Sequence, residues 1–394
     1  MRKQKYILVL NSGSTSLKFK IFNYYSLKEI HCGAIEKIGL KKSIIQFDNS
    51  NIKNRKTIIN HSQALKIIND FIKNETNIKI SLILHRIVHG GVEFNQATKL
   101  DQKTINKISK YNNLAPLHNP VNLKVAQEAL KIWPRIKQIG MFDTMFFKNI
   151  PLPAYLYPLP LKYFQKYNIR KFGFHGFSHQ NMLKWSAKNL KKRINQCNLI
   201  TCHLGGGSSI AVIKNGEPIE ISMGFSPSSG LMMMNRAGDL DPAIIFHLLK
   251  NAKMSLNQIY QLLNFESGLR GMTKIGDLRD IMILAGYKIK NYSSPRLEKG
   301  LGGKSNTKAT KENKQLAKLA LDLFIYKIQR YLSSYITLLP KIDAIVFSGA
   351  IGERNADIRN LIFKNIYFPK KYKKIIVKCN EEKIMAEIIK KINL

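Results

Sequence analysis

Acidic residues are scarce in this chain of 394 residues. Only 25 aspartates and glutamates stand against 64 lysines and arginines, which gives a formal net charge of +39. A field of that sign attracts polyanions without specificity. The basic residues are spread along the whole length among Asn and Ile, however, and are not gathered into one arm or interleaved with stacking aromatics. We therefore interpret the charge as a drift in composition that favours anionic substrates, and we expect no specific nucleic-acid partner.

Long apolar stretches are also missing. No apolar run approaches the roughly 18–20 residues of a membrane-spanning helix, so we expect no membrane partner. The basic N-terminus followed by Tyr6–Leu10 resembles a signal peptide, but its apolar stretch is too short and continues into the polar Asn11–Ser14 instead of a cleavage site with small residues. We expect a buried strand here and a cytoplasmic location.

Cysteine is rare and scattered. The four cysteines, Cys32, Cys197, Cys202 and Cys379, form no C-x-x-C pair. This spacing argues against a zinc site and against a disulfide framework. We expect all of them to be reduced thiols.

Two segments about two hundred residues apart share one pattern, which predicts two related halves. In the first, the apolar strand Tyr6–Leu10 leads through a turn rich in Gly, Ser and Thr (Asn11–Ser16) into a second strand. In the other, apolar Asn198–Leu204 leads through the glycine turn Gly205–Ser209 into a returning strand. The length of the chain also favours two domains.

Apolar periodicity predicts further elements. Helices are expected over Ser62–Lys73, Val121–Ile132, Pro242–Asn251 and Asn313–Leu338, and strands over Ile80–Val88, Ile139–Phe142 and Asp343–Phe347. The segment Ile289–Lys311 is rich in Lys, Gly, Ser and Asn and has no apolar period, so we expect a mobile surface insertion. Its G-L-G-G-K-S stretch lacks the first glycine and the preceding strand of a P-loop, and that motif is therefore rejected.

Three loops of small residues follow predicted strands. They are N-S-G-S-T-S-L-K at 11–18, H-L-G-G-G at 203–207, and S-G-A-I-G-E at 348–353, which opens a helix. Small residues let backbone amides approach phosphate oxygens, and a helix N-terminus favours anions. Taken alone, the first loop is explained slightly better by an ordinary hairpin turn. Three such loops at strand ends together predict binding of nucleotide phosphates.

Charged residues stand in short polar motifs elsewhere. Arg86 at a strand end can clamp a carboxylate or phosphate, and Arg236 offers a second guanidinium. Asp143 follows another strand, and His175 lies among glycines. His175 and His179 have an i,i+4 spacing but lack the intervening glutamate and third ligand of a zinc site. For any one of these residues alone a structural role is favoured, but the set suits phosphoryl transfer, which needs positioning and charge neutralisation.

The order of the motifs resembles that of the acetate kinase family. The matching segments are N-S-G-S-T-S-L-K-F from Asn11, H-R-I-V-H-G-G from His85, A-P-L-H-N-P from Ala115, F-D-T from Phe142, G-F-H-G-F-S-H from Gly173, S-M-G-F-S-P from Ser222, E-S-G-L from Glu266, D-L-R-D from Asp277 and N-E-E from Asn380. The resemblance implies a homodimer of chains with two duplicated α/β domains around a cleft, of the acetate and sugar kinase/Hsp70/actin (ribonuclease H-like) type. Residues 1–147, with a C-terminal helix at about 383–394 packed back on them, would form the acyl-kinase domain, and 148–382 the nucleotide-binding domain.

The resemblance also implies the roles of individual residues. Asn11 and Glu381 would organise Mg²⁺ (or Mn²⁺), and Lys18 would meet the nucleotide phosphates. Arg86 and Arg236 would bind the carboxylate and the moving phosphoryl group, His175 would stabilise the transition state, and Asp143 would orient the reactants or accept a proton. The nucleotide segments would be His203, Leu204, Gly205, Gly206, Gly207, Asp277, Leu278, Arg279, Ala350, Ile351, Gly352, Glu353 and Arg354. The pocket for the acyl methyl group would be Val88, Leu117, Phe174 and Pro227.

Three departures from the family pattern affect the nucleotide loops. Gly206 replaces an asparagine that contacts phosphate, as in the related butyrate kinases, and Arg354 replaces an asparagine near the adenosine. The segment Met234–Gly238 keeps its arginine but not the neighbours of that arginine. Every charged catalytic position is retained, so we expect activity that is either slow or shifted in its nucleotide or acyl preference.

The sequence therefore predicts an acetate kinase that transfers a phosphoryl group reversibly from ATP to acetate, directly and in line, giving acetyl phosphate and ADP on the route to acetyl-CoA. One alternative is a propionate- or butyrate-type acyl kinase, and another is a degenerate, non-catalytic basic binding protein. A sugar kinase or an Hsp70-like ATPase is disfavoured, because Arg86, Asp143 and His175 stand in acyl-kinase motifs.

Overall fold

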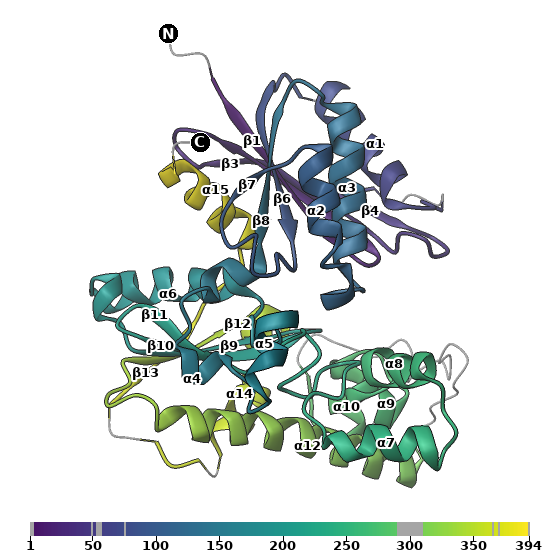
Figure 1. Cartoon of the computed structure of the whole chain (residues 1–394), viewed down its shortest axis with the longest axis vertical. Coiled ribbons are helices and arrows are strands. Elements are labelled where there is room, and N and C mark those ends of the chain that lie inside the picture. Colours follow the sequence, from purple (N-terminus) through teal and green to yellow (C-terminus); the bar gives the residue numbers. More distant parts are fainter. Residues whose placement is uncertain are drawn as a thin grey trace. The chain divides into compact units, whose positions relative to one another are not determined.

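The chain divides into two compact units in a computed structural model that describes residues 4–48, 50–52, 57–74, 76–289, 310–364, 366–368 and 371–392 (Figure 1). Unit 1 comprises Met1–Lys148, Phe174–Asn181 and Asn380–Leu394, and unit 2 comprises Asn149–Gly173 and Met182–Cys379. Of the expected insertion, 290–309 lie outside the described residues.

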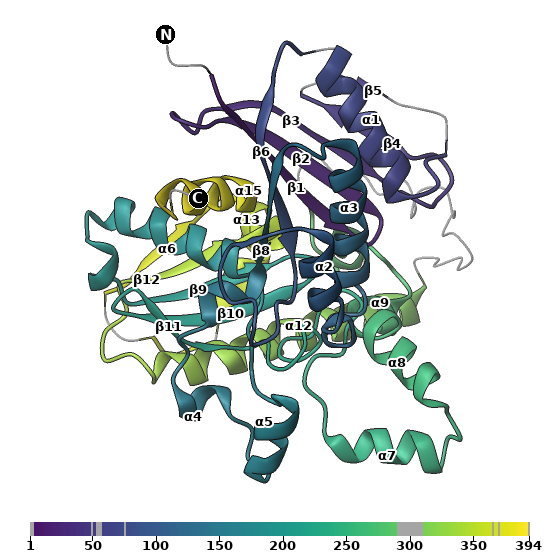
Figure 2. The ribbon, with the colours of Figure 1, turned by 45° about the horizontal axis from the view of Figure 1, so that its top comes forward.

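Unit 1 is built on a mixed sheet with the strand order β5-β4-β3-β2-β1-β6-β8-β7. Its strands are β1 (Tyr6–Gly13), β2 (Ser16–Asn23), β3 (Glu29–Glu36), β4 (Ile44–Phe47), β5 (Ser50–Ile52), β6 (Ile80–Ile87), β7 (Thr98–Lys99) and β8 (Lys137–Phe142). The first three form an antiparallel meander, which Figure 2 shows side by side, and β6 and β8 continue the sheet parallel to β1. The carboxyl ends of β1, β6 and β8 therefore meet at one edge of the sheet.

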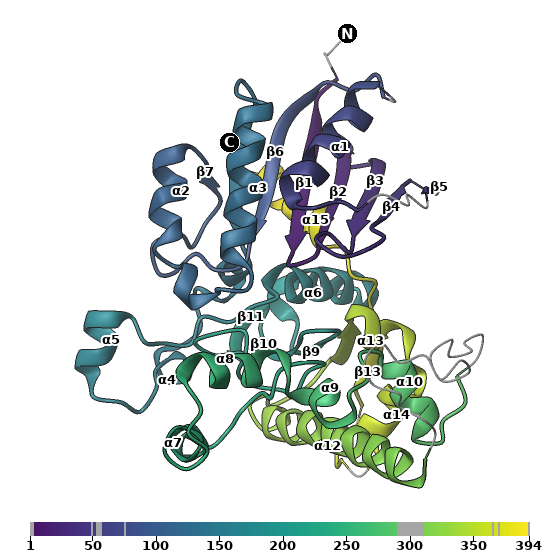
Figure 3. The same cartoon turned by 90° about the vertical axis from the view of Figure 1, so that its right-hand side faces the viewer.

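Helices cover both faces of this sheet. They are α1 (His61–Asn74), α2 (Gln102–Ser109), α3 (Asn119–Ile132) and α15 (Glu381–Ile392), with short 3₁₀ turns at Asn112–Leu114 and Asp143–Phe147. One face packs against α1 and α3, and the opposite face packs against α15 (Figure 3). Because side chains alternate along a strand, each strand contributes apolar residues to both layers.

The alternation fixes where the polar side chains at the strand ends point. Ile7 and Val9, Leu82 and Leu84, and Ile139 and Met141 all face α15. Two residues further along the three strands come Asn11, Arg86 and Asp143. With a period of two, these three side chains lie on the α15 face of the sheet, on neighbouring strands. Ser12 belongs to the other face, with Leu8 and Leu10.

Unit 2 repeats the central part of that topology. Its sheet has the order β11-β10-β9-β12-β13, with β9 (Leu199–Leu204), β10 (Ser208–Lys214), β11 (Glu217–Ile221), β12 (Ala344–Ser348) and β13 (Lys373–Ile376). Here too an antiparallel meander is continued by two parallel strands. The predicted relation between the two halves is thus present as an equivalent strand order.

Helices connect and cover the strands of unit 2. They are α4 (Leu152–Tyr155), α5 (Leu161–Tyr167), α7 (Pro242–Lys250), α8 (Leu256–Phe265), α9 (Gly268–Thr273), α10 (Leu278–Leu284), α12 (Lys311–Ile336), α13 (Gly349–Arg354) and α14 (Ala356–Phe363), with a 3₁₀ turn at Ile194–Gln196. The long helix α12 buries Ala320, Phe324 and Ile328 against alternate residues of β9 and β10. Helix α6 (Gly176–Leu190) begins in unit 1 and continues into unit 2.

The predicted helices and strands are present with shifts of one or two residues at their ends, except that β1 extends three residues beyond the predicted Tyr6–Leu10. The turn expected over Asn11–Ser16 was too wide, because β1 continues through Gly13, which pairs with Ser16 across a tight hairpin. The sequence also missed α6, which begins inside the motif G-F-H-G-F-S-H. Among the described helices, none combines the length and the apolar character needed to cross a membrane.

Candidate active site

Arg86 is the centre of a charged cluster at the edge of the unit 1 sheet. Its Nε and Nη2 donate to Oδ1 and Oδ2 of Asp143 at 2.8 and 2.7 Å, which is the planar two-point geometry of an arginine–carboxylate pair. The side chain of Arg86 is 16% exposed and that of Asp143 is 2% exposed. Asp143 therefore fixes the plane of the guanidinium from the end of β8.

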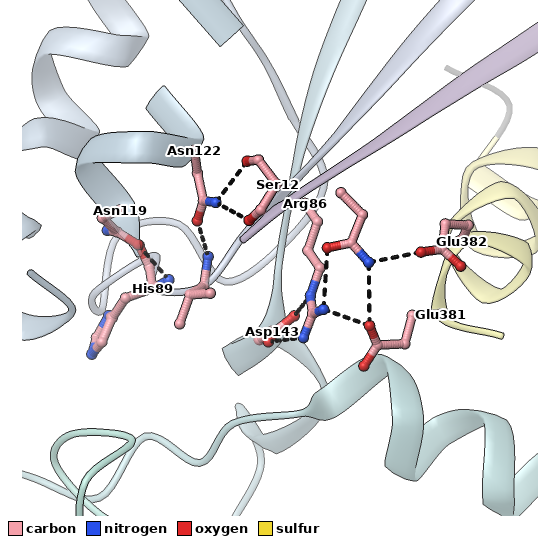
Figure 4. Close-up of polar contacts among 10 residues, drawn as sticks. Ser12, Arg86, His89, Asn119, Asn122, Asp143, Glu381 and Glu382 are labelled. Atoms are coloured by element: carbon pink, nitrogen blue, oxygen red, sulfur yellow. Dashed lines mark hydrogen bonds and ion pairs between the residues drawn. The ribbon is translucent and has the colours of Figure 1, made fainter. Parts of the chain in front are cut away.

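Helix α15 supplies the other side of the cluster (Figure 4). Nη1 of Arg86 donates to Oε2 of Glu381 at 2.5 Å and to Oδ1 of Asn11 at 3.3 Å. Asn11 in turn donates from Nδ2 to Oε1 of Glu382 at 2.7 Å. Residues at the two ends of the chain thus meet the ends of β1, β6 and β8 in one hydrogen-bonded network.

The cluster holds more negative than positive charge. Burial by itself disfavours a charged guanidinium, but the carboxylates of Asp143 and Glu381 more than offset this and raise the pKa of Arg86. Burial also raises the pKa of Glu381 to about 7, although Arg86 acts in the opposite direction. Carboxylate and amide oxygens are the ligands that Mg²⁺ prefers, so the donor set of Asn11, Glu381 and Glu382 fits a divalent cation.

His175 lies in unit 1 and has a strained backbone. Its φ is +58°, in the left-handed region that residues with a side chain rarely adopt. Gly176 follows it and packs against the chain at Asp143, where a Cβ would lie 2.1 Å from the backbone oxygen of Asp143. Strain of this kind persists where the surroundings enforce it and is concentrated at functional sites. His179, one turn into α6, is fully buried and its ring stacks edge-on against Phe147, so it belongs to the packing.

Three of the predicted acyl-pocket residues lie in unit 1. Val88 and Leu117 are half-buried, and Phe174 is buried with its ring 5.3 Å from that of His89. Val88 comes two residues after Arg86, so a small apolar side chain lies next to the guanidinium along the chain. Pro227 belongs to unit 2, where its carbonyl accepts a hydrogen bond from Nη1 of Arg236 at 2.9 Å.

Lys18 lies on β2 directly opposite Asn11 in the antiparallel register. Opposite residues of an antiparallel pair point to the same face of the sheet, so the exposed Lys18 ammonium extends from the face that carries Asn11. The first loop is therefore a tight hairpin with a cation beside it. Its use for phosphate stays a prediction.

In unit 2, the second and third loops of small residues are neighbours. His203 of β9 pairs with Ser348 of β12 in a parallel register, so the glycines 205–207 and helix α13 leave the same edge of the sheet. Gly349 has φ +82° and its missing Cβ would lie 2.5 Å from the oxygen of Leu204, so only glycine fits there. Oε1 of Glu353 accepts from the N–H of Gly349 at 2.9 Å and from that of Cys379 at 2.8 Å. This carboxylate ties α13 to the segment that follows β13.

The remaining segments predicted to bind the nucleotide are ordered by local contacts. Asp277 caps α10 by accepting from the N–H of Arg279 at 2.9 Å, and its carboxylate also pairs with the guanidinium of Arg279 at 2.6 Å. Leu278 is buried beneath them, and Ala350, Ile351, Gly352 and Arg354 lie on the short helix α13. Gly206 has open space around its Cα, because a Cβ added there would meet nothing within 4 Å.

The loop that carries Arg236 is held by its backbone. Met233 and Met234 accept from the N–H groups of Leu269 and Arg270 at 3.0 and 2.8 Å, and Asn235 accepts from Ser267 at 3.2 Å. Gly268 has φ +65° and its missing Cβ would meet the oxygen of Met233 at 2.2 Å. The neighbours of the arginine are thus contacted through main-chain atoms, which explains how their side chains can depart from the family pattern. Burial lowers the pKa of Arg236, but a guanidinium stays charged at neutral pH.

Several site residues were missed at the sequence level. Glu382, Asn119 and Asn122 all contact the ends of β1 or β6. The only signal for the asparagines was their position in and just after A-P-L-H-N-P, and Glu382 was part of N-E-E without a role of its own.

Comparison with known proteins gives one consistent result. The sequence profile of the acetokinase family matches residues 6–291 and 303–387. Acetate kinase of Sulfurimonas denitrificans is 37% identical over 369 residues, covering 91% of this chain and 87% of the relative. A crystal structure of a propionate kinase from Francisella tularensis subsp. tularensis has a TM-score of 0.85 at 31% identity, with 98% of each chain covered. That of Porphyromonas gingivalis acetate kinase has a TM-score of 0.81 at 29% identity, covering 99% of this chain and 100% of that one. These likenesses confirm the predicted fold class.

Proposed function

Because the chain belongs to the acetokinase family, we propose that it is an acetate kinase, transferring a phosphoryl group reversibly from ATP to acetate and giving acetyl phosphate and ADP. The observation that carries the proposal is the two-point Arg86–Asp143 pair. It lies in one hydrogen-bonded cluster with Asn11, Glu381 and Glu382 at the edge of the unit 1 sheet. An arginine in a fixed plane, next to a half-buried valine, suits a small carboxylate with a short apolar tail.

Unit 1 would bind the acyl substrate. Arg86 holds the acetate carboxylate so that one oxygen faces the phosphorus, and Asp143 orients the guanidinium and can hold a proton. Val88, Leu117 and Phe174 receive the methyl group. His175 stabilises charge that develops on the transferred phosphoryl group, and its left-handed backbone fixes the direction of its side chain.

Asn11 and Glu381 are the residues that we propose for Mg²⁺, with Glu382 as a further oxygen donor held by Asn11. When bound, the ion neutralises charge on the nucleotide phosphates. Asn11 also accepts from Arg86, so the metal ligands and the carboxylate-binding residue are held in one network.

Unit 2 would bind the nucleotide. We assign the phosphates to the backbone of His203–Gly207, and the remainder of the nucleotide to Asp277–Arg279 and Ala350–Arg354. Arg236 neutralises the moving phosphoryl group and Pro227 contributes to the acyl pocket. This division makes unit 1 the acyl-kinase domain and unit 2 the nucleotide-binding domain. The bounds differ from the expected 1–147 and 148–382, because 174–181 and 380–382 belong to unit 1. We further propose a homodimer in the cytoplasm, where ATP is available.

A propionate kinase is the second candidate, because one of the similar solved structures is that of a propionate kinase. A pocket of small apolar residues discriminates one methylene by only about 1–3 kcal/mol. Acetate and propionate kinases can therefore differ by modest changes around Val88.

The proposal is tested by trapping acyl phosphate as its hydroxamate with magnesium-ATP and acetate, propionate or butyrate. We expect product with acetate and a smaller kcat/KM for each longer acid. A larger kcat/KM for propionate would favour the second candidate. Absence of product with every acid from folded protein would contradict an acyl kinase and favour a basic, non-catalytic binding protein.

A further inference from the structure

Two asparagines on the first turn of α3, Asn119 and Asn122, hold the chain beside Arg86 (Figure 4). Both side chains are buried, with exposed fractions of 0% and 2%. Residues three apart lie on one face of a helix, so both amides reach the ends of the neighbouring strands from a single turn. None of the catalytic roles proposed above uses either residue.

Asn122 joins the ends of two strands with one side chain. Its Oδ1 accepts from the N–H of Val88 at 3.1 Å. Its Nδ2 donates to the backbone oxygen of Ser12 at 2.8 Å and to the Ser12 hydroxyl at 2.9 Å. Ser12 follows Asn11 on β1, and Val88 comes two residues after Arg86 on the chain leaving β6. The amide thus links the segment of the proposed metal ligand to the segment of the proposed acyl pocket.

Asn119 holds His89, the residue after Val88, in the same way. Its Oδ1 accepts from the N–H of His89 at 3.0 Å, and its Nδ2 donates to the oxygen of His89 at 2.9 Å. The strand β6 ends at Ile87, so Val88 and His89 lie beyond the last described ladder pair of that strand. The two side-chain amides therefore provide hydrogen bonds that a neighbouring strand would otherwise supply.

We infer that Asn122, assisted by Asn119, is a positioning residue that sets the acyl-chain selectivity of the enzyme by fixing Val88 relative to Arg86. The inference rests on the proposed function, because it concerns the same acyl pocket. Val88 is linked to Arg86 through Ile87 on one side and held by Asn122 on the other. A pocket wall held at two points resists the displacement that a longer acyl chain requires.

Only an amide can make all of these contacts. Val88 offers a donor and Ser12 offers an acceptor, so the side chain must accept with one atom and donate with the other. Alanine at this position leaves the N–H of Val88 and the oxygen of Ser12 without these partners, which favours a shift of Val88. Aspartate keeps an acceptor for the N–H of Val88 but has no donor for Ser12 when ionised.

The test compares kcat and KM for acetate, propionate and butyrate in wild type, Asn122→Ala and Asn122→Asp. For Asn122→Ala we expect kcat/KM for acetate to fall by about 10-fold or more, mainly through KM, because a displacement of about 1 Å is enough for such a loss. The ratio of acetate to propionate kcat/KM should fall by at least about 5-fold, since the looser pocket loses part of its discrimination of one methylene. Asn122→Asp should lie closer to wild type in this ratio.

The control is Asn69→Ala on α1, a buried asparagine of the same unit whose described side-chain contact is with Asp70. It should change stability but leave the ratio unchanged. The inference is overturned if folded Asn122→Ala keeps the wild-type ratio to within about two-fold, well below the discrimination of one methylene. If Asn122→Ala does not fold, Asn119→Ala, which releases the peptide of His89 in the same segment, is judged by the same ratio. Inactive wild type would contradict the proposed function, whereas active wild type with an unchanged ratio in the variants contradicts only this inference.

Discussion

Gly176 lies directly against the backbone oxygen of Asp143, so closely that a Cβ at position 176 would come within 2.1 Å of it. This approach links the two segments of unit 1 that carry Asp143 and His175. His175 precedes the glycine with φ +58°, and the side chain of Asp143 forms the two-point pair with Arg86. The close packing of Gly176 thus fixes His175, the proposed transition-state residue, relative to Asp143, the proposed acid–base residue.

Gly176→Ala should therefore destabilise the protein and impair catalysis. Forcing a methyl group against a main-chain atom costs typically about 1–3 kcal/mol, and the displacement should lower kcat by at least about 10-fold. Chemical denaturation and the hydroxamate assay measure the two effects. Gly276→Ala is the control for stability, because a Cβ there meets nothing within 4 Å and its φ is not in the left-handed region. Equal stability of the two variants would contradict the packing argument.

The Arg86→Lys variant should keep the positive charge at this position but bind acetate more weakly. An ammonium cannot reproduce the planar fork that meets both oxygens of Asp143, so we expect kcat/KM for acetate to fall by about 100-fold or more. The exposed Arg135→Lys in the same unit is the matched control and should behave as wild type. Wild-type kinetics in Arg86→Lys would remove the guanidinium from the mechanism.

Gly206→Asn should strengthen nucleotide binding without a loss of stability. The position is open, with nothing within 4 Å of an added Cβ, and an asparagine amide can donate to a phosphate oxygen. One such bond to a charged group is worth about 1.5–3 kcal/mol, so KM for ATP should fall by about 10-fold. Gly349→Ala is the contrasting variant. It should unfold at lower denaturant concentration, because its Cβ would meet the oxygen of Leu204 at 2.5 Å with φ +82°. An unchanged KM for ATP in Gly206→Asn would show that the loop does not contact phosphate there.

We expect the buried His85 to make the folded protein less stable in acid. Its ring is buried and bonded through Nε2 to Oε1 of Gln138 at 2.8 Å, and burial lowers its pKa to about 4. The unfolded chain takes up the proton near the ordinary value of 6.5, whereas the folded protein takes it up only near 4. Stability is therefore complete above pH 6.5 and falls on acidification through this window, by at most about 1.4 kcal/mol per pH unit from this group.

His85→Gln should flatten that slope, because glutamine does not titrate. The free energy of unfolding is measured by denaturant titration between pH 7 and pH 4.5 for wild type and variant. His247→Gln, an exposed residue of α7, is the control and should keep the wild-type slope. Parallel pH profiles for wild type and His85→Gln would mean that the buried ring is protonated as easily in the folded protein as in the unfolded chain.

The sequence predicted those features that depend on local pattern. Strand alternation and the strand ends located Arg86 and Asp143, and the recurring strand–turn–strand pattern predicted the duplicated sheets. Short edge strands were not predicted. In β13, for example, only Ile375 is buried, so there is no apolar alternation to detect. Helix α6 was missed because two glycines near its start weaken its helical signal.

The cluster around Arg86 could not be derived from local pattern, because its members are distant in sequence. Asn11 and Glu382 are 371 residues apart, and Arg86 and Glu381 are 295 apart. Their meeting depends on α15 packing on a particular face of the sheet. Similarly, Asn122 reads as an ordinary helix residue until the ends of β1 and β6 lie beside it. The resemblance to a family gave roles to some of these residues, but not to the asparagines.

The most direct test of the proposed phosphoryl transfer to acetate follows a carboxylate oxygen of acetate into acetyl phosphate. Acetate labelled with oxygen-18 in its carboxylate is incubated with magnesium-ATP and the enzyme, and the phosphorus NMR signal of acetyl phosphate is recorded. Direct transfer to the carboxylate held by Arg86 predicts a signal shifted by the heavy isotope, since one carboxylate oxygen becomes bonded to phosphorus. ATP consumption that yields only inorganic phosphate with oxygen from water, with no labelled acetyl phosphate, would contradict the account.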